Sequence, residues 1–378
     1  MKPHVAIVGC DSYDYPRVRR AVNIGMELLG GVEAFVQPDD KILLKPNVLA
    51  GDKPEKSVTV HPQVFRAVID YFSRSHNNIS CGDSPGFGHL KQQLKKAGLA
   101  KVAEDMNVNL ADFEHGREYR FPNSPFTKKF TLADAIDRHD ALISISKLKT
   151  HQLTRLTGAV KNQFGCIPGL LKMEYHVTTP DPHDFAKMLV SLTLALKPRL
   201  YIMDAIRAMQ GNGPRGGETT PMNVLLFSTD PIALDAVAAR LVDLKPEYMP
   251  TALPGQEWGL GTFQKEKITL LGDSIERFIN PHFDVVRKPV SSVVGASGIS
   301  MFKNWVAPRP KIRLELCIAC GICVESCPVN PKALSQPDPD KPPIYTYSRC
   351  IRCYCCQELC PHKAIQVSVP RLGRLLGH

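Results

Sequence analysis

Two cysteine-rich strings near the end of the sequence repeat one spacing. Each contains four cysteines in the order C-x2-C-x2-C-x3-C followed by proline, and the second string lies 33 residues after the first. The eight cysteines are Cys317, Cys320, Cys323, Cys327, Cys350, Cys353, Cys356 and Cys360. Three thiolates within seven residues can bind three irons of a cubane, whereas zinc is usually bound by two separated C-x2-C pairs. The spacing therefore favours iron–sulfur clusters over zinc.

The repeat resembles the bacterial ferredoxins that hold two [4Fe–4S] clusters. In those proteins the fourth cysteine of each string binds the cluster of the other string. The resemblance implies a first cluster bound by Cys317, Cys320, Cys323 and Cys360. It implies a second cluster bound by Cys350, Cys353, Cys356 and Cys327. Cys355 falls outside the repeat, and we interpret it as a small residue within the loop.

Residues 1–290 alternate short apolar runs with amphipathic segments. The apolar runs predict strands at Val5–Val8, Lys41–Leu44, Ile79–Cys81, Val108–Leu110, Ala141–Ile145, Leu200–Met203, Val224–Phe227 and Ile268–Leu271. The amphipathic segments predict helices at Val18–Leu29, Pro62–Ser73, Leu90–Ala97, Phe185–Leu196 and Pro231–Leu241. Short apolar strands followed by helices are typical of a mostly parallel sheet covered by helices on both faces. We therefore predict a large α/β domain over residues 1–290.

The chain changes character after this domain. Serine, glycine and proline are frequent between residues 291 and 310, which we predict to be a linker. Residues 311–370 contain both cysteine strings and are expected to form a small C-terminal ferredoxin-like α+β module. Residues 371–378 remain as a tail.

Polar motifs follow several of the predicted strands, and ligands bind to parallel sheets at the carboxyl ends of the strands. The motif GDSPG places Asp83 directly after the strand at 79–81. In SKLKTH, alternate residues share one face of an extended chain. The predicted site for a carboxylate or phosphate is lined by Lys45, Asn47, Lys147, Lys149, His151, Lys161 and Asn162. The alternatives are a plain β-turn for GDSPG and a solvated sheet edge for SKLKTH.

Three further motifs have more than one interpretation. The glycine-rich GNGPRGG contains Arg215 and is expected to cradle an anion, to form a mobile lid, or to be a plain loop. The string KMEYH supplies Tyr175 and His176, which together with Asp83 are the candidate proton carriers. In DPIALDAVAARL, Asp230 fits a helix N-cap, so this segment is interpreted mainly as a helix.

Six strings of the large domain resemble, in order, the family known as domain of unknown function 362. They are LKPN, GDSPG, SKLKTH, TGAVKNQFGCIPG, DAIRAMQGNGPRGG and DPIALDAVAARL. The resemblance covers about residues 1–290. Members of that family often carry a C-terminal ferredoxin module, so the resemblance implies this two-part architecture and no particular activity.

Composition restricts the classes of partner. The chain of 378 residues is 43% apolar and 22% charged, with a formal net charge of +10 that suits an acidic substrate. No apolar run approaches the ~20 residues of a membrane helix, and the first residues do not resemble a signal peptide. No zinc-finger or RNA-binding signature occurs. We therefore expect a cytoplasmic protein with neither a membrane nor a nucleic acid as its partner.

These observations predict a redox enzyme. A low-potential donor, similar to a ferredoxin or a flavodoxin, would reduce the two [4Fe–4S] clusters. Electrons would then pass to a small anionic substrate in the α/β domain. No flavin or nicotinamide fingerprint is present in the sequence. Two alternatives remain open: an electron carrier or assembly partner without substrate chemistry, and a non-redox enzyme with structural clusters.

Overall fold

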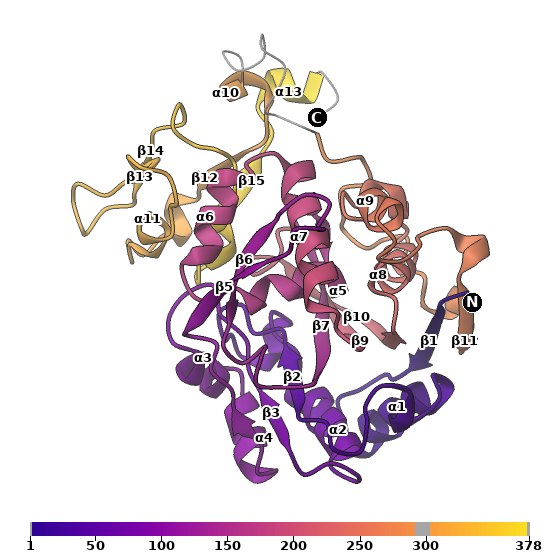
Figure 1. Cartoon of the computed structure of the whole chain (residues 1–378). Coiled ribbons are helices and arrows are strands. Elements are labelled where there is room, and N and C mark those ends of the chain that lie inside the picture. Colours follow the sequence, from indigo (N-terminus) through magenta and orange to yellow (C-terminus); the bar gives the residue numbers. More distant parts are fainter. Residues whose placement is uncertain (1, 292–302, 376–378) are drawn as a thin grey trace.

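The computed structural model describes residues 2–291 and 303–375 (Figure 1). Nine of the described strands form one sheet, ordered β11-β1-β10-β9-β7-β2-β3-β4, with β8 paired to β7. Their bounds are β1 His4–Gly9, β2 Ile42–Pro46, β3 Ile79–Cys81, β4 Asn109–Leu110, β7 Ala141–His151, β8 Arg155–Thr157, β9 Leu200–Gln210, β10 Glu218–Ser228 and β11 Thr269–Gly272. All eight strands predicted from the sequence are present in this sheet.

The sheet is mostly parallel. Strands β9, β7, β2, β3 and β4 run parallel to one another, as β1 does to β11. Strand β10 is antiparallel to both β1 and β9, and the short β8 is antiparallel to β7. The parallel strands place the ends of β2, β3 and β7 at one edge, where the polar motifs follow.

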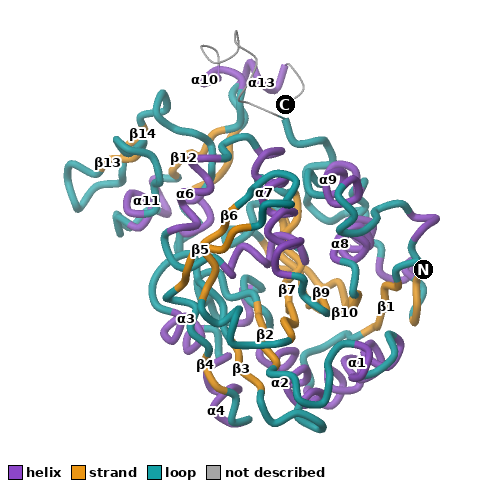
Figure 2. Tube along the Cα trace, viewed as in Figure 1, coloured by secondary structure: helices purple, strands orange, loops and turns teal. Residues whose placement is uncertain are grey.

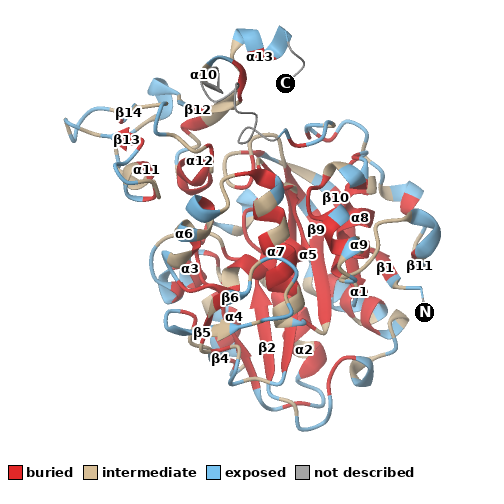
Figure 3. Ribbon diagram, turned by 45° about the horizontal axis from the view of Figure 1, so that its top comes forward, coloured by how far each residue is buried: buried red, intermediate tan, exposed pale blue. Residues whose placement is uncertain are grey.

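Helices cover both faces of the sheet, as Figures 1 and 2 show. Alternate strand residues pack into different clusters: Ala6 and Leu225 join one cluster, whereas Val5 and Leu226 join another. The first face is covered by α1 Tyr15–Leu28, α2 Pro62–Phe72, α3 Leu90–Lys96 and α4 Leu99–Asp105. The other is covered by α5 Ala159–Asn162, α7 Pro182–Leu196, α8 Pro231–Leu241 and α9 Ala252–Glu257. The central strands, such as β2 and β7, are therefore buried on both sides (Figure 3).

Several elements of the described large domain are not foreseen by the sequence, among them the short strand β8 and the short helices α4, α5 and α9. Strands β5 Gly116–Arg120 and β6 Lys129–Ala133 form a separate hairpin. Helix α6, Leu171–Thr178, includes the KMEYH string. Strand β7 also continues six residues beyond the predicted end at Ile145, so that the whole SKLKTH motif is strand.

The C-terminal module has two short antiparallel ribbons and two short helices. Strand β12 Arg309–Ile312 pairs with β15 Ile365–Ser368, and β13 Leu334–Ser335 pairs with β14 Ile344–Tyr345. The helices are α11 Ile322–Glu325 and α12 Cys355–Leu359. A further pair, α10 Lys303–Val306 and α13 Arg371–Leu375, lies side by side at one end.

The predicted linker, 291–310, falls largely outside the described residues. Within it, α10 begins at Lys303 and β12 begins at Arg309, two residues before the boundary expected at 311. Strand β12 begins early because its partner β15 offers a register that pairs Arg309 with Ser368.

The GNGPRGG loop joins the two parts of the molecule. The Arg215 guanidinium lies 2.6 Å from the Asp52 carboxylate and donates to the carbonyl of Leu359 in α12. The Gln357 amide donates to the carbonyl oxygens of Asn212 and Gly213. This loop therefore holds α12 against the large domain.

Candidate functional site

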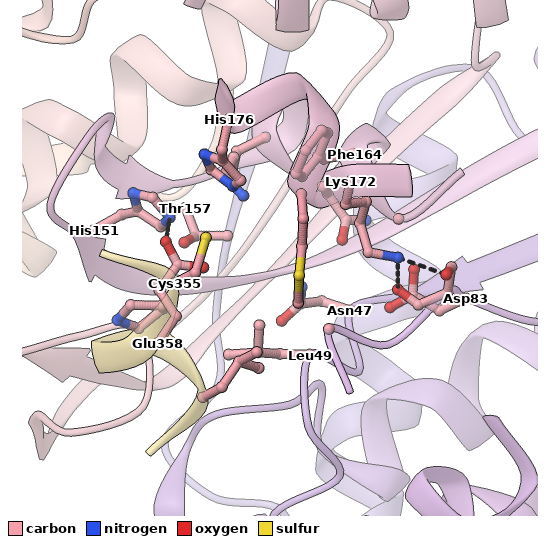
Figure 4. A pocket seen from close by; sticks show the side chains of 18 of the residues that line it. Asn47, Leu49, Asp83, His151, Thr157, Phe164, Lys172, His176, Cys355 and Glu358 are labelled. Atoms are coloured by element: carbon pink, nitrogen blue, oxygen red, sulfur yellow. Dashed lines mark hydrogen bonds and ion pairs between the residues drawn. The ribbon is translucent and has the colours of Figure 1, made fainter. Parts of the chain in front are cut away.

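A cavity lies where helix α12 meets the edge of the large sheet (Figure 4). It encloses about 710 Å³ of empty space including its mouth, and about 80 Å³ of this can hold the centre of a water molecule. Its polar lining comes from both parts of the molecule: Asn47, Asp83, Ser84, Lys149, His151, Thr157, Lys161, Asn162, Lys172, His176, Cys355 and Glu358. Apolar side chains, among them Leu49, Phe164 and Leu359, complete the wall.

The buried ion pair of Lys45 and Asp83 forms one border of the cavity. The Lys45 ammonium lies 2.7 Å from the Asp83 carboxylate, and both side chains are almost fully buried. The other Asp83 oxygen accepts from the backbone N–H of Val48. Gly165 permits this arrangement, because a Cβ atom there would lie 1.9 Å from the Asp83 oxygen. Asp83 is thus a wall residue whose charge is balanced by Lys45.

Lys161 presents an unpaired amino group to the cavity. Among the described residues, no hydrogen-bond acceptor or carboxylate is within bonding distance of its ammonium. The ammonium instead lies over the rings of Phe164 and Phe185, 4.8 and 5.7 Å from their centroids. Burial lowers the pKa of Lys161. Because aromatic faces stabilise a cation without using its N–H groups, those donors remain available to a ligand.

Two other lysines of the cavity differ in how many donors they have left. The Lys149 ammonium donates to the Asn47 amide oxygen at 2.7 Å and to the Val58 carbonyl at 2.5 Å. The Lys172 ammonium donates to Ile167 and to two oxygens of Ser84. Burial lowers the pKa of Lys149 and that of Lys172 to about 7. Neither lysine has a carboxylate partner within ion-pair distance among the described residues.

His151 and Glu358 connect the two parts of the molecule within the cavity wall. Nδ1 of His151 accepts from the backbone N–H of Leu153, so the ring proton is on Nε2, 2.9 Å from the Glu358 carboxylate. Burial lowers the pKa of His151, and the imidazole is neutral. Burial would raise the pKa of Glu358, but His151 and Lys161 outweigh it and lower that pKa to about 2. The pair is a neutral N–H donor and a carboxylate.

His176 is buried and faces the cavity from helix α6. Its side chain is only 4% exposed, and the ring is stacked on Phe185 at 4.6 Å and meets Phe164 edge-on. Burial lowers the pKa of His176 to about 3, so the ring is neutral near pH 7. It can donate or accept one hydrogen bond, but it cannot serve as an imidazolium acid there.

Four residues predicted from the sequence do not line the cavity. The Lys147 ammonium is bound by the Asp204 carboxylate at 2.8 Å and by the Tyr13 hydroxyl. The Tyr175 ring packs on Phe130. Arg215 holds α12, as described above. Lys45 also lies behind the wall, where Asp83 separates it from the open space.

Sequence reasoning missed five residues of the polar lining: Ser84, Thr157, Lys172, Cys355 and Glu358. Lys172 precedes His176 by four residues, so helical spacing places both on one face of α6. Cys355 and Glu358 are likewise three residues apart on α12. The sequence therefore shows that each pair shares one helix face, but it does not indicate which part of the molecule that face contacts.

The eight cysteines of the repeat surround two smaller cavities. One is lined by Cys317, Cys320, Cys323 and Cys360, and encloses about 360 Å³ of empty space. The other is lined by Cys327, Cys350, Cys353 and Cys356, and encloses about 320 Å³. These are the two sets that the ferredoxin resemblance implies. Four thiols around a void of this size are a donor set that fits a four-iron cubane.

Hydrogen-bond donors approach the sulfur atoms of these cavities. The backbone N–H of Ala333 donates to Cys327, and that of Ala364 donates to Cys360, both at 3.3 Å. The Tyr345 hydroxyl lies 3.3 Å from the Cys356 sulfur. Such donors stabilise negative charge on thiolate ligands and tune the potentials of clusters.

Comparison with known proteins identifies both parts of the chain. A family model described as a domain of unknown function (DUF362) matches residues 42–240, and a 4Fe-4S dicluster domain matches residues 309–361. The thylakoid-associated protein sll1697 of Synechocystis sp. is 33% identical over 261 residues, which cover 69% of this chain and 81% of that protein.

Among solved structures, the lactate racemase apoprotein from Thermoanaerobacterium thermosaccharolyticum has a TM-score of 0.39 and 10% identity. The match covers 61% of this chain and 54% of that chain, so this chain spans about half of the racemase. None of the helices in the described part of the chain is long and apolar enough to cross a membrane.

Proposed function

Because the chain belongs to the DUF362 family and carries a 4Fe-4S dicluster domain, we propose that it is an iron–sulfur oxidoreductase that reduces a small anionic substrate. One observation carries this proposal. Helix α12 lies between cysteines of both predicted cluster sites, and the same helix supplies Cys355, Glu358 and Leu359 to the wall of the cation-lined cavity. Cluster ligands and substrate pocket thus share one element.

Clusters held by the two cysteine sets would supply the electrons, since a [4Fe–4S] centre exchanges one electron and two centres would provide the pair for a two-electron reduction. The residues of the large domain have the other roles. Lys149 and Lys161 bind the anionic group, and the Asn47 and Asn162 side chains fix Lys149 and Lys45 in place. His151 faces the Glu358 carboxylate across the junction, with Nε2 2.9 Å from a carboxylate oxygen.

The test uses the full-length protein, purified or reconstituted without oxygen. It should contain about 8 iron and 8 sulfide per chain, in line with two four-iron clusters. After chemical reduction, the visible absorbance of the clusters should recover rapidly when a substrate anion is added. Lys161→Met should keep the iron and sulfide content but slow this reoxidation at least tenfold. Clusters that cannot be reduced and reoxidised would support structural centres instead.

A second candidate, an electron carrier that docks another protein, is favoured by a separate observation. Cys320 of the first predicted cluster site is exposed, and near it in sequence Leu314 and Ile318 are 69% and 60% exposed. These side chains could contact the low-potential donor that the enzyme requires, or an acceptor protein. Reoxidation by a protein alone, with no response to small anions, would select the carrier function. A cytoplasmic location stays a prediction.

A further inference from the structure

The size of the cavity limits its ligand. About 80 Å³ can hold the centre of a water molecule. Since a single water needs ~10–15 Å³ by this measure, the space accommodates roughly five to eight non-hydrogen atoms. A nucleotide or a coenzyme A thioester is several times larger, so neither can enter as a whole.

The charges of the wall limit the ligand further. Lys149, Lys161 and Lys172 line the cavity, but so do the carboxylates of Asp83 and Glu358. Lys45 balances the charge of Asp83, but a dianion such as phosphate would still meet repulsion from the Glu358 carboxylate at short range. A single carboxylate group matches the small excess of positive charge.

Counting donors places the anion between two lysines. A lysine ammonium has three N–H donors. Lys172 directs all three to Ser84 and Ile167, whereas Lys149 directs two to Asn47 and Val58 and keeps one. Lys161 has no acceptor within hydrogen-bond distance in the described part of the chain, lies over the rings of Phe164 and Phe185, and keeps all three.

We propose that the cavity binds a monocarboxylate of about five to eight non-hydrogen atoms between Lys161 and Lys149, and that Lys149 takes up a proton when the anion binds. This inference rests on the proposed function in one respect only, the assignment of an anionic ligand to this cavity. It adds the chemical class of the ligand and a protonation change that accompanies binding.

The surroundings of Lys149 are the reason for proton uptake. Its two acceptors are neutral, and the side chain is 1% exposed. The charged groups that face it are Lys147 on its own strand, Lys161 on α5, Asp83 after β3 and Glu358 on α12. Burial and the charges of the two lysines lower the pKa of Lys149 to about 7, although the two carboxylates act to raise it. A bound carboxylate adds a negative charge and raises that pKa, so a neutral Lys149 gains a proton.

Isothermal titration calorimetry on the anaerobic full-length holoprotein tests both parts. The probes are propionate, butyrate, crotonate and hexanoate, with orthophosphate and AMP for comparison, at pH 8. Each titration is repeated in two buffers that differ in ionisation enthalpy, because the difference in measured heat gives the number of protons taken up. The four carboxylates should include binders with an uptake approaching one proton, and AMP should not compete with them.

Two substitutions assign the proton to Lys149. Lys149→Arg keeps a permanent positive charge, so carboxylate should still bind but with uptake reduced to near zero. Lys149→Met should weaken carboxylate binding at least tenfold. Lys91→Gln, an exposed lysine of α3, is the matched control and should change neither quantity. Cluster absorbance confirms that each variant is folded.

Tighter binding of AMP or orthophosphate than of every carboxylate would overturn the ligand class. Undiminished proton uptake in Lys149→Arg would overturn the role of Lys149. These failures are separable from a failure of the proposed function. Carboxylate binding with proton uptake, but without any reoxidation of reduced clusters, would refute the reductase and leave this inference standing.

Discussion

Asp83 illustrates how burial changes the role expected of a carboxylate. The sequence made it a candidate proton carrier, but its ion pair with Lys45 is almost fully buried. Asp83→Asn should therefore lower the free energy of unfolding by about 3–5 kcal/mol, because Lys45 would be left as an uncompensated buried charge. Chemical denaturation of the holoprotein measures this loss.

The double variant Lys45→Met/Asp83→Leu is the control, since it removes both charges together. It should regain most of the lost stability, because replacing both members of a buried pair with apolar groups is often close to neutral. If Asp83→Asn is as stable as the wild type, the pair is not charged in the folded protein.

Cys355 and Cys356 are neighbours with different expected roles. Cys356 lines a four-cysteine cavity, whereas Cys355 lines the anion cavity. Cys356→Ser should lose about half of the iron and sulfide, while Cys355→Ser should keep both clusters and change only anion binding or reoxidation. Metal analysis and electron paramagnetic resonance of the reduced variants distinguish the two. If Cys355→Ser loses iron and Cys356→Ser keeps both clusters, the cluster ligand is Cys355, and the alignment of the second string is wrong by one residue.

At the scale of elements, Asp235 on α8 determines where α5 begins. Its carboxylate accepts from the backbone N–H groups of Ala159 and Val160, at 2.6 and 3.2 Å. Gly158 makes room for it, since a Cβ atom there would lie 2.0 Å from a carboxylate oxygen. Helix α5 carries Lys161 and Asn162, so this contact places two residues of the site.

The contact predicts a pH dependence of stability. Burial raises the pKa of Asp235 to about 7, although the two N–H donors lower it. Since this is above the unfolded value near 3.9, the folded state holds the proton more tightly, and the stabilisation is present at low pH and is lost as pH rises from about 4 through 7. The loss is up to about 4 kcal/mol. Asp235→Asn cannot ionise and should flatten the dependence.

Denaturant titrations of the wild type and of Asp235→Asn at several pH values between 4 and 8 give, for each protein, the slope of the free energy of unfolding against pH. The comparison depends on slope alone, so a constant cost of the asparagine side chain does not affect it. Parallel curves would show that Asp235 titrates near its ordinary value.

At the scale of the whole molecule, the cavity depends on the docking of the cluster module. Helix α12 is preceded by Cys353, contains Cys356 and is followed by Cys360, so the predicted clusters would restrain it at both ends. Removal of iron by an anaerobic chelator should therefore weaken the binding of a small carboxylate at least tenfold. Calorimetry before and after chelation measures this change, and circular dichroism checks that the large domain remains folded. Equal affinity in both forms would show that α12 keeps its place without clusters.

The sequence by itself determined eight strands of the large sheet, five helices of its domain and the repeated cysteine spacing. Apolar runs such as Ile79–Cys81 predict buried strands, and the repeat spacing identifies the eight cysteines, whose division into two sets is implied by the ferredoxin resemblance. Both signals are local, because periodicity and ligand spacing depend on a few consecutive residues. The same local logic placed Lys149, His151 and Lys161 near one sheet edge.

Only the tertiary structure decided which of the charged residues are free. Lys147 and Lys149 are two residues apart on β7, yet Asp204 neutralises the first and the second meets only neutral acceptors. The partners come from strands and helices distant in sequence, and the last wall of the cavity comes from the other end of the chain through α12. Burial then determines the charge state, since the desolvation of each lysine depends on what packs around it.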